Sequence, residues 1–419
     1  MDYLDMPIGL TATFLLAVSA AIVIGYSIGS HGGPVPRGDP RRTSSIVRKL
    51  FDLSLAIALI AIIVSIIEAL LSGAANLSFS GLGEAYTAGY EGYERNTGNY
   101  SAYFIIYSLT LPFTFISSIW GIYYFRTLGW KRAGLVVLLI FSNLLFHVLF
   151  SGKQKQVGDL LIYLSAVLMI KYAIRARRID FKMIFASIFA GLLAVMLFVI
   201  VLGQRYAALG VDAGNINQRI LYRVAFDQDH LVFKLFGPDH GLSLALFSTY
   251  LSQGYYGLGL AMQTDWVWTR FSGFSYSLSV LVSRFLGFEW QWPNTLLHRT
   301  GLETGWDETK WHTVFTHFAT DFTWPGTVVL FGIFAFAYAR CWLTAVRFQN
   351  PFAILLFALL TMGMFFMPAN NQLLHSPGQL FTLLMVVFLY LANAGRSFLP
   401  NPIGRSNRPF QTNRHATAT

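Results

Sequence analysis

Nine apolar runs, separated by polar segments, dominate the pattern of hydrophobic and polar positions along this chain. They cover residues 8–28, 51–71, 103–125, 133–150, 157–173, 183–202, 322–345, 352–367 and 380–392. A helix needs about 20 apolar residues to cross a bilayer, and most of these runs approach or exceed that length. The last two are shorter, so we expect each to extend by about one turn at its ends. The pattern predicts about nine transmembrane helices.

The composition agrees with this prediction. Hydrophobic residues make up 55% of the chain and charged residues only 12%, whereas soluble domains contain about 25% charged residues. We therefore expect an all-α polytopic membrane protein. Two more apolar segments, 244–262 and 276–288, would raise the number of spans to eleven if both crossed the membrane. Their glycines and Arg284 suit a membrane surface better than a bilayer centre, so we interpret them as interfacial helices.

The basic residues indicate an orientation. Most of the 30 lysines and arginines lie near the ends of the first, third, fifth and seventh runs or in the C-terminal tail, and such residues favour cytoplasmic loops. The N-terminus, with Asp2 and Asp5, is then outside and the C-terminus is cytoplasmic. The net charge of +10 is thus a topology signal, so no nucleic-acid partner is needed. The single cysteine, Cys341, excludes an intramolecular disulfide and a cysteine-based metal site.

The pattern divides the chain into four parts. Residues 1–202 form a six-span region, 203–321 an extracytoplasmic loop, 322–394 a three-span region and 395–419 a disordered, basic, cytoplasmic tail. The long loop holds five of the nine histidines and six of the ten tryptophans. Because loops on a rigid scaffold commonly carry function, we expect substrate binding and catalysis in residues 203–321.

The most pointed candidate site is the sequence HTVFTHFATDFTWPG, residues 312–326. In a helix, His317 and Asp321 are four residues apart and share a face. The carboxylate could then orient the imidazole as a general base, with His312 as the substitute base. The alternative is structural: Asp321 caps the start of the seventh span, and Pro325 lies in its first turn.

A second group of candidates is basic and lies near the predicted outer surface. Its members are Lys153 and Lys155 in the turn SGKQKQ, and Arg205, Arg219, Arg223 and Arg284 in the long loop. Arginine binds phosphate with two parallel hydrogen bonds, and lysine acts as a point charge. Together they indicate a diphosphate-bearing lipid. The alternative for each is contact with lipid headgroups.

Aromatic residues form a third group. Trp306 and Trp311 flank a polar stretch, and Tyr255 and Tyr256 lie in an apolar segment, so these four are the candidate sugar-binding residues. Tryptophan at a membrane interface is otherwise an anchor. The sequence FDQDH contains a D-x-D pair, but a hard-cation site needs more oxygen ligands than this pair offers. We therefore expect no metal and no other cofactor.

Three stretches resemble the Wzy-type polymerases of bacterial polysaccharide repeat units, a family of membrane-embedded C-type glycosyltransferases. They are TVFTHFATDFTWPGTVVLFGIFAFAYAR (313–340), YLSQGYYGLGLAM (250–262) and SGKQKQ (151–156). The many-span architecture with one long loop agrees. The chain departs from the family pattern at Thr323, where glycine often follows Asp-Phe. It also lacks, in the long loop, an arginine followed eleven positions later by glycine.

The resemblance implies a glycosyltransferase of the bacterial inner membrane that polymerises polyprenyl-diphosphate-linked oligosaccharides. A flippase and a chain-length regulator would be its functional partners. The basic group would stabilise the departing diphosphate, and His317 would accept the proton of the acceptor hydroxyl. Two alternatives remain open: an O-antigen-ligase-like transfer to another acceptor, and a transporter of polysaccharide or lipid-linked sugar. A transporter would place polar residues at mid-span in two similar halves.

Overall fold

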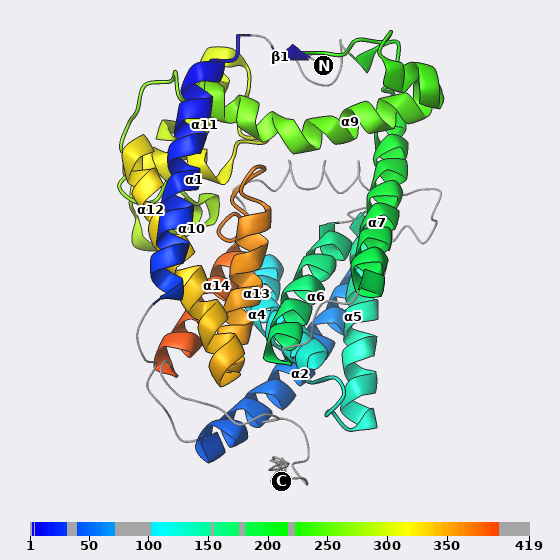
Figure 1. Ribbon diagram of the computed structural model, residues 1–419, viewed down its shortest axis with the longest axis vertical. Coiled ribbons are helices and arrows are strands. Elements are labelled where there is room, and N and C mark those ends of the chain that lie inside the picture. Colours follow the sequence, from blue (N-terminus) through cyan, green and yellow to red (C-terminus); the bar gives the residue numbers. More distant parts are fainter. Residues whose placement is uncertain are drawn as a thin grey trace, which may run out of the picture.

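The computed structural model describes residues 2–3, 5–31, 40–71, 102–151, 155–175, 181–216 and 223–393, and this part of the chain is almost entirely helical (Figure 1). The helices are α1 (Ile8–Ser30), α2 (Pro40–Leu71), α4 (Ala102–Tyr124), α5 (Trp130–Ser151), α6 (Lys155–Ile174), α7 (Phe181–Ala208), α9 (Leu231–Ala261), α10 (Tyr276–Leu286), α11 (Leu296–Thr304), α12 (Val314–Phe348), α13 (Pro351–Phe365) and α14 (Pro377–Ala392). A short 3-10 helix, η2 (Trp292–Asn294), precedes α11. The strands β1 (Asp2–Tyr3) and β2 (Val224–Ala225) form a two-residue antiparallel pair.

Among the described residues, seven helices are long and apolar enough to cross a membrane: α1, α2, α4, α5, α6, α7 and α12. These seven correspond to the first seven apolar runs of the sequence. The expectation of an all-α, membrane-embedded protein is therefore confirmed at this level.

The last two apolar runs form helices that stay short. α13 has 15 residues and α14 has 16, against about 20 for a full crossing. The Asn350 side chain accepts hydrogen bonds from the backbone N–H groups of Phe352 and Ala353 and so fixes the start of α13. α14 begins at Pro377, about one turn before its run. α13 packs among α4, α6, α12 and α14, and nearly all its side chains are buried.

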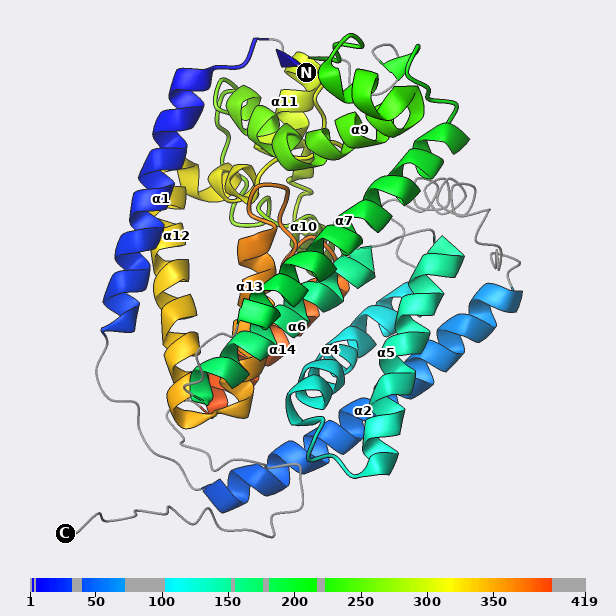
Figure 2. The ribbon, with the colours of Figure 1, turned by 45° about the vertical axis from the view of Figure 1, so that its right-hand side comes forward.

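The helices α1 and α12 lie side by side over most of their length (Figures 1 and 2). Their backbones touch at Gly25, where a Cβ atom would lie 2.0 Å from the backbone oxygen of Gly332. A larger residue at Gly25 would force the two helices apart, because small residues are what permit such close packing. α12 kinks at Thr323, whose φ of 62° is left-handed. The axis of the helix before Thr323 therefore differs in direction from the axis after it.

The segment between α7 and α12 contains one long helix, α9, and the short helices α10 and α11, and α9 crosses one end of the molecule (Figure 1). α9 runs from the end of α7 towards the start of α1, across the long helices rather than along them (Figure 1). It is kinked at Gly237, where φ is 75°. Neither α9 nor α10 is among the seven candidate spans. We call this end of the molecule the α9 end.

The helix bounds differ from the predicted limits of the long loop. α7 continues to Ala208 and α12 already begins at Val314, so the segment outside the long helices is 209–313 rather than 203–321. The predicted loop therefore included the last turns of one helix and the first turns of another. The predicted tail, 395–419, lies outside the described residues.

Candidate functional site

A cavity of about 140 Å³ lies where three segments that are distant in sequence meet. The segments are 292–297 at η2 and α11, 308–317 leading into α12, and 370–375 between α13 and α14. Its lining residues are Trp292, Leu297, Glu308, Thr309, Lys310, Trp311, His312, His317, Asn370 and His375. The walls thus combine three imidazoles and two indoles with one acid and one base. We call this space the histidine cavity.

A tight turn positions the first histidine. The Asp307 carboxylate accepts a hydrogen bond from the Thr309 backbone N–H at 3.0 Å, and the Asp307 carbonyl accepts one from the Lys310 N–H at 3.1 Å. The Nε2 atom of His312 lies 3.1 Å from the same carbonyl. Because a carbonyl oxygen can only accept, this nitrogen carries a hydrogen. The turn therefore selects one tautomer of His312.

Packing against α9 keeps His312 out of water. Burial lowers its pKa from 6.5 to about 4, although the hydrogen bond to Asp307 acts in the opposite direction. The ring is therefore neutral near pH 7. The close approach of α9 requires Gly257, where a Cβ atom would lie 2.7 Å from the Trp311 carbonyl oxygen and 3.0 Å from Nδ1 of His312.

The other two histidines face each other in the cavity. His317 lies one turn into α12 and is 4% exposed, and its ring centroid is 6.5 Å from that of His375, with the ring planes at 85°. Many protein atoms surround the His375 ring, but the side chain is exposed and lines the cavity. Desolvation lowers the pKa of His375, and the nearby charge of Lys155 lowers it further. A neutral imidazole of this kind can accept a proton.

The structure gives Asp321 a role different from both predicted ones. Its carboxylate accepts hydrogen bonds from Thr269 Oγ1 at 2.6 Å, from the Phe271 backbone N–H at 2.8 Å and from the Phe274 backbone N–H at 2.9 Å. It therefore anchors the turn 269–274 and does not orient His317. His317 and Asp321 are four residues apart in a helix, as predicted. The Asp321 carboxylate nevertheless accepts its hydrogen bonds from a turn that is distant in sequence.

Asp321 is not a helix cap either. α12 begins seven residues earlier, at Val314, whose backbone N–H donates to the Met367 carbonyl at 3.0 Å. After the kink, the Thr323 hydroxyl accepts a long bond of 3.5 Å from the Gly326 N–H, so Thr323 occupies the capping position. Asp321 instead stabilises a turn in which Arg270 and Phe271 have positive φ angles of 54° and 59°. Such non-glycine conformations persist where their surroundings enforce them.

Three predicted ligand-binding residues are engaged within the fold. Arg223 donates to the Tyr256 hydroxyl at 2.8 Å, to the Thr304 carbonyl at 3.5 Å and to the Asp5 carboxylate at 2.9 Å. Its guanidinium thus joins the N-terminus, α9 and α11. Tyr256 and Trp306 are fully buried and pack edge to face, with ring centroids 4.9 Å apart. Neither aromatic face is open to a sugar.

The other predicted residues are dispersed. Trp311 does line the histidine cavity, and its ring packs edge to face on Tyr250 with centroids 4.7 Å apart. Tyr255, in α9, is half-buried and does not line the cavity. Arg205 and Arg284 lie in the last turns of α7 and α10, also away from the cavity. Lys153 and Arg219 lie outside the described residues.

Three residues that line the cavity were not predicted from the sequence: Trp292, Asn370 and His375. His375 lies in the polar stretch NNQLLHSPG, between the eighth and ninth apolar runs, and this break could have marked it. No role was predicted for Trp292. Lys155 was included among the basic residues, and it forms an ion pair with Asp159 next to this region.

Comparison with known proteins gives no further assignment. No protein-family model, curated protein or solved structure matches this chain. The arrangement of side chains in the histidine cavity is therefore the basis for a functional hypothesis.

Proposed function

We propose that this protein is a membrane-embedded glycosyltransferase that joins polyprenyl-diphosphate-linked oligosaccharides into a polysaccharide. The observation that carries the proposal is the facing pair of His317 and His375 in a cavity that also presents Trp292, Trp311 and Lys310. Indole faces suit the C–H faces of a sugar ring, and neutral imidazoles suit proton transfer from a hydroxyl.

In the proposed reaction, the acceptor hydroxyl oxygen forms a bond to the anomeric carbon of the donor. The bond from that carbon to the diphosphate oxygen breaks, and the diphosphate leaves with the electron pair. The hydroxyl proton passes to the imidazole of His317, while His375 holds the hydroxyl from the other side. Lys310 is the basic group that lines the cavity, and it would stabilise the charge that grows on the diphosphate.

The size of the cavity indicates how much of the substrates it could enclose. Its volume of about 140 Å³ is smaller than the roughly 300–1,000 Å³ of pockets that enclose a whole ligand. The cavity would therefore hold only the reacting ends, with the remaining sugars and the lipid chain outside it.

The orientation is part of the proposal. The chain would cross the bacterial inner membrane nine times, with α13 and α14 as short crossings inside the bundle and with the N-terminus outside. The α9 end is then the outer end, and α9 lies along the membrane surface. Thr323 stands where the family often has glycine, and its φ of 62° is a conformation that glycine adopts without strain.

The test is a set of chromosomal variants in the native host. His317→Ala should leave lipid-linked single repeat units to accumulate and remove the polymer ladder, since a general base contributes about 10² to 10⁴ in rate. His240→Ala, which changes an exposed histidine of α9, is the matched control and should give a normal ladder. A normal ladder from His317→Ala at equal protein abundance would rule out the proposed reaction at this cavity.

A further inference from the structure

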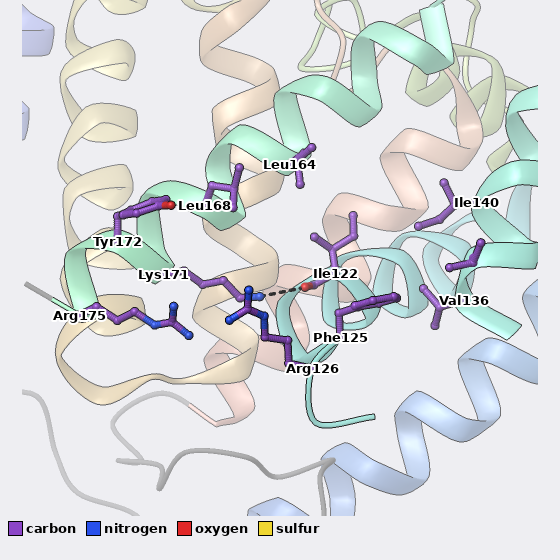
Figure 3. A pocket seen from close by; sticks show the side chains of 11 residues that line it. Ile122, Phe125, Arg126, Val136, Ile140, Leu164, Leu168, Lys171, Tyr172 and Arg175 are labelled. Carbon is purple, nitrogen blue, oxygen red and sulfur yellow. Dashed lines mark hydrogen bonds between the residues drawn. The ribbon is translucent and has the colours of Figure 1, made fainter. Parts of the chain in front are cut away.

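A second and larger cavity lies between α4, α5 and α6 (Figure 3), towards the ends of these helices that point away from α9 (Figure 2). Its volume is about 380 Å³. Seven apolar side chains form its walls: Ile122, Phe125, Val136, Val137, Ile140, Leu164 and Leu168. Three basic side chains, Arg126, Lys171 and Arg175, gather at one end of it (Figure 3). We call this cavity the basic groove.

The charges of the basic groove are not balanced by acids. No aspartate or glutamate is among its lining residues, all of which belong to the described part of the chain. Lys171 donates a hydrogen bond to the Ile122 carbonyl at 3.1 Å and lies over the Tyr123 ring at 5.5 Å, so its position is fixed. Arg126 and Arg175 are exposed. The groove therefore presents three neighbouring positive charges to any ligand that enters it.

The walls of the groove open onto the outer surface of the helix bundle. Phe125 is 43% exposed, Val137 52% and Leu168 38%. In a membrane-spanning bundle such side chains face acyl chains. A ligand that satisfies both parts of the groove has an anionic head and an apolar tail, and basic pockets between helices at the cytoplasmic surface bind anionic lipid headgroups.

We propose that the basic groove is a binding site for an anionic phospholipid of the inner leaflet. Arg126 and Arg175 would contact the headgroup phosphate, with Lys171 as a fixed third charge, while one acyl chain lies against Phe125 and Leu168. The guanidinium groups can each give two parallel hydrogen bonds to the phosphate oxygens. This site is independent of the glycosyl transfer proposed at the histidine cavity and is lined by different helices.

The test uses native mass spectrometry of the purified full-length protein with added lipid. Phosphatidylglycerol and phosphatidylethanolamine with identical acyl chains are titrated separately, and inorganic phosphate is added as a competitor. The wild type should bind one phosphatidylglycerol in clear preference to phosphatidylethanolamine. The variant Arg126→Gln/Arg175→Gln should bind it about tenfold more weakly or worse, because two charges near the headgroup are lost.

Two further variants separate this site from a general charge effect. Arg48→Gln/Arg347→Gln removes two exposed arginines that do not line the groove and should bind phosphatidylglycerol like the wild type. Arg126→Lys/Arg175→Lys retains the charges and should recover most of the preference. Equal binding of the two lipids by the wild type, equal loss in both Gln pairs, or full displacement by millimolar inorganic phosphate would each overturn the proposal. A melting curve for each variant shows that it is folded.

Discussion

The histidine cavity and the basic groove are lined by different helices, and they are built in opposite ways. The histidine cavity is small, and two of its three histidines are almost fully buried. The basic groove is larger, and two of its three basic residues are exposed. The histidine cavity is lined by one acidic residue, Glu308, and one basic residue, Lys310. The charged residues that line the basic groove are all basic.

This difference suits the two proposed roles. The proposed proton transfer needs reacting groups that are held within hydrogen-bond reach and kept out of water, and the hydrogen bonds around Asp307 fix the position of His312 in the cavity wall. Retention of a lipid needs charge near the membrane surface and an apolar wall, and neither requires fixed side chains. Rigid and open sites respond differently to substitution, and this leads to measurable expectations.

The largest expected effect concerns the two facing histidines. His317→Ala and His375→Ala should each lower the rate of chain growth by about 10² or more, and the double variant should be hardly slower than the worse single one. Residues that act as a unit show such non-additive losses. The measurement is the initial rate on purified lipid-linked repeat units in proteoliposomes.

The basic groove should show the opposite behaviour. Arg126→Gln and Arg175→Gln should each weaken phosphatidylglycerol binding by a similar factor, and the factors should multiply in the double variant, because exposed charges contribute separately. Multiplying losses at the histidines, or saturating losses at the arginines, would remove the distinction between the two sites.

The next largest effect is expected at Asp321. Asp321→Asn replaces a carboxylate that accepts three hydrogen bonds with an amide that has one acceptor oxygen and places its NH₂ against a backbone donor. We expect a loss of about 3 kcal/mol in the free energy of unfolding, since bonds to charged groups contribute about 1.5–3 kcal/mol each. Thermal unfolding in detergent measures this. An unchanged melting curve with slow chain growth would instead favour a direct catalytic role.

Asp321 and His375 show how far the sequence could predict this molecule. Whether a segment forms a membrane-spanning helix depends on the length of its own apolar run. The seven long helices could therefore be predicted from the sequence. Partners of buried polar groups depend on segments far apart in the chain: the turn 269–274 takes the Asp321 carboxylate, and the loop 370–375 brings His375 to His317. A single sequence shows which residues could make such contacts, but it does not show which residue pairs with which.

A smaller effect follows from the buried His312. Its folded-state pKa of about 4 lies below the usual 6.5, so the unfolded chain binds more protons between these values and stability falls as pH falls through this window. Between pH 7 and pH 5 the loss is about 2 kcal/mol. His312→Gln should flatten the pH dependence of the melting temperature, and His240→Gln, an exposed change, should not. Equal slopes in all three proteins would show that His312 is not buried as a neutral ring.

The smallest effect is expected at the contact that joins the N-terminus to the α9 end. Tyr256→Phe removes the hydroxyl that accepts the Arg223 hydrogen bond at 2.8 Å, and should lower the free energy of unfolding by about 1 kcal/mol. Tyr255→Phe, the neighbouring position on α9, is the matched control and should be near neutral. Asp5→Asn should also have little effect, because the Asp5 side chain is 83% exposed and exposed ion pairs contribute about 0–1 kcal/mol. Normal stability of Tyr256→Phe together with a loss of chain growth would instead restore Tyr256 and Arg223 as ligand-binding residues, and the α9 end would then rely on other contacts for its rigidity.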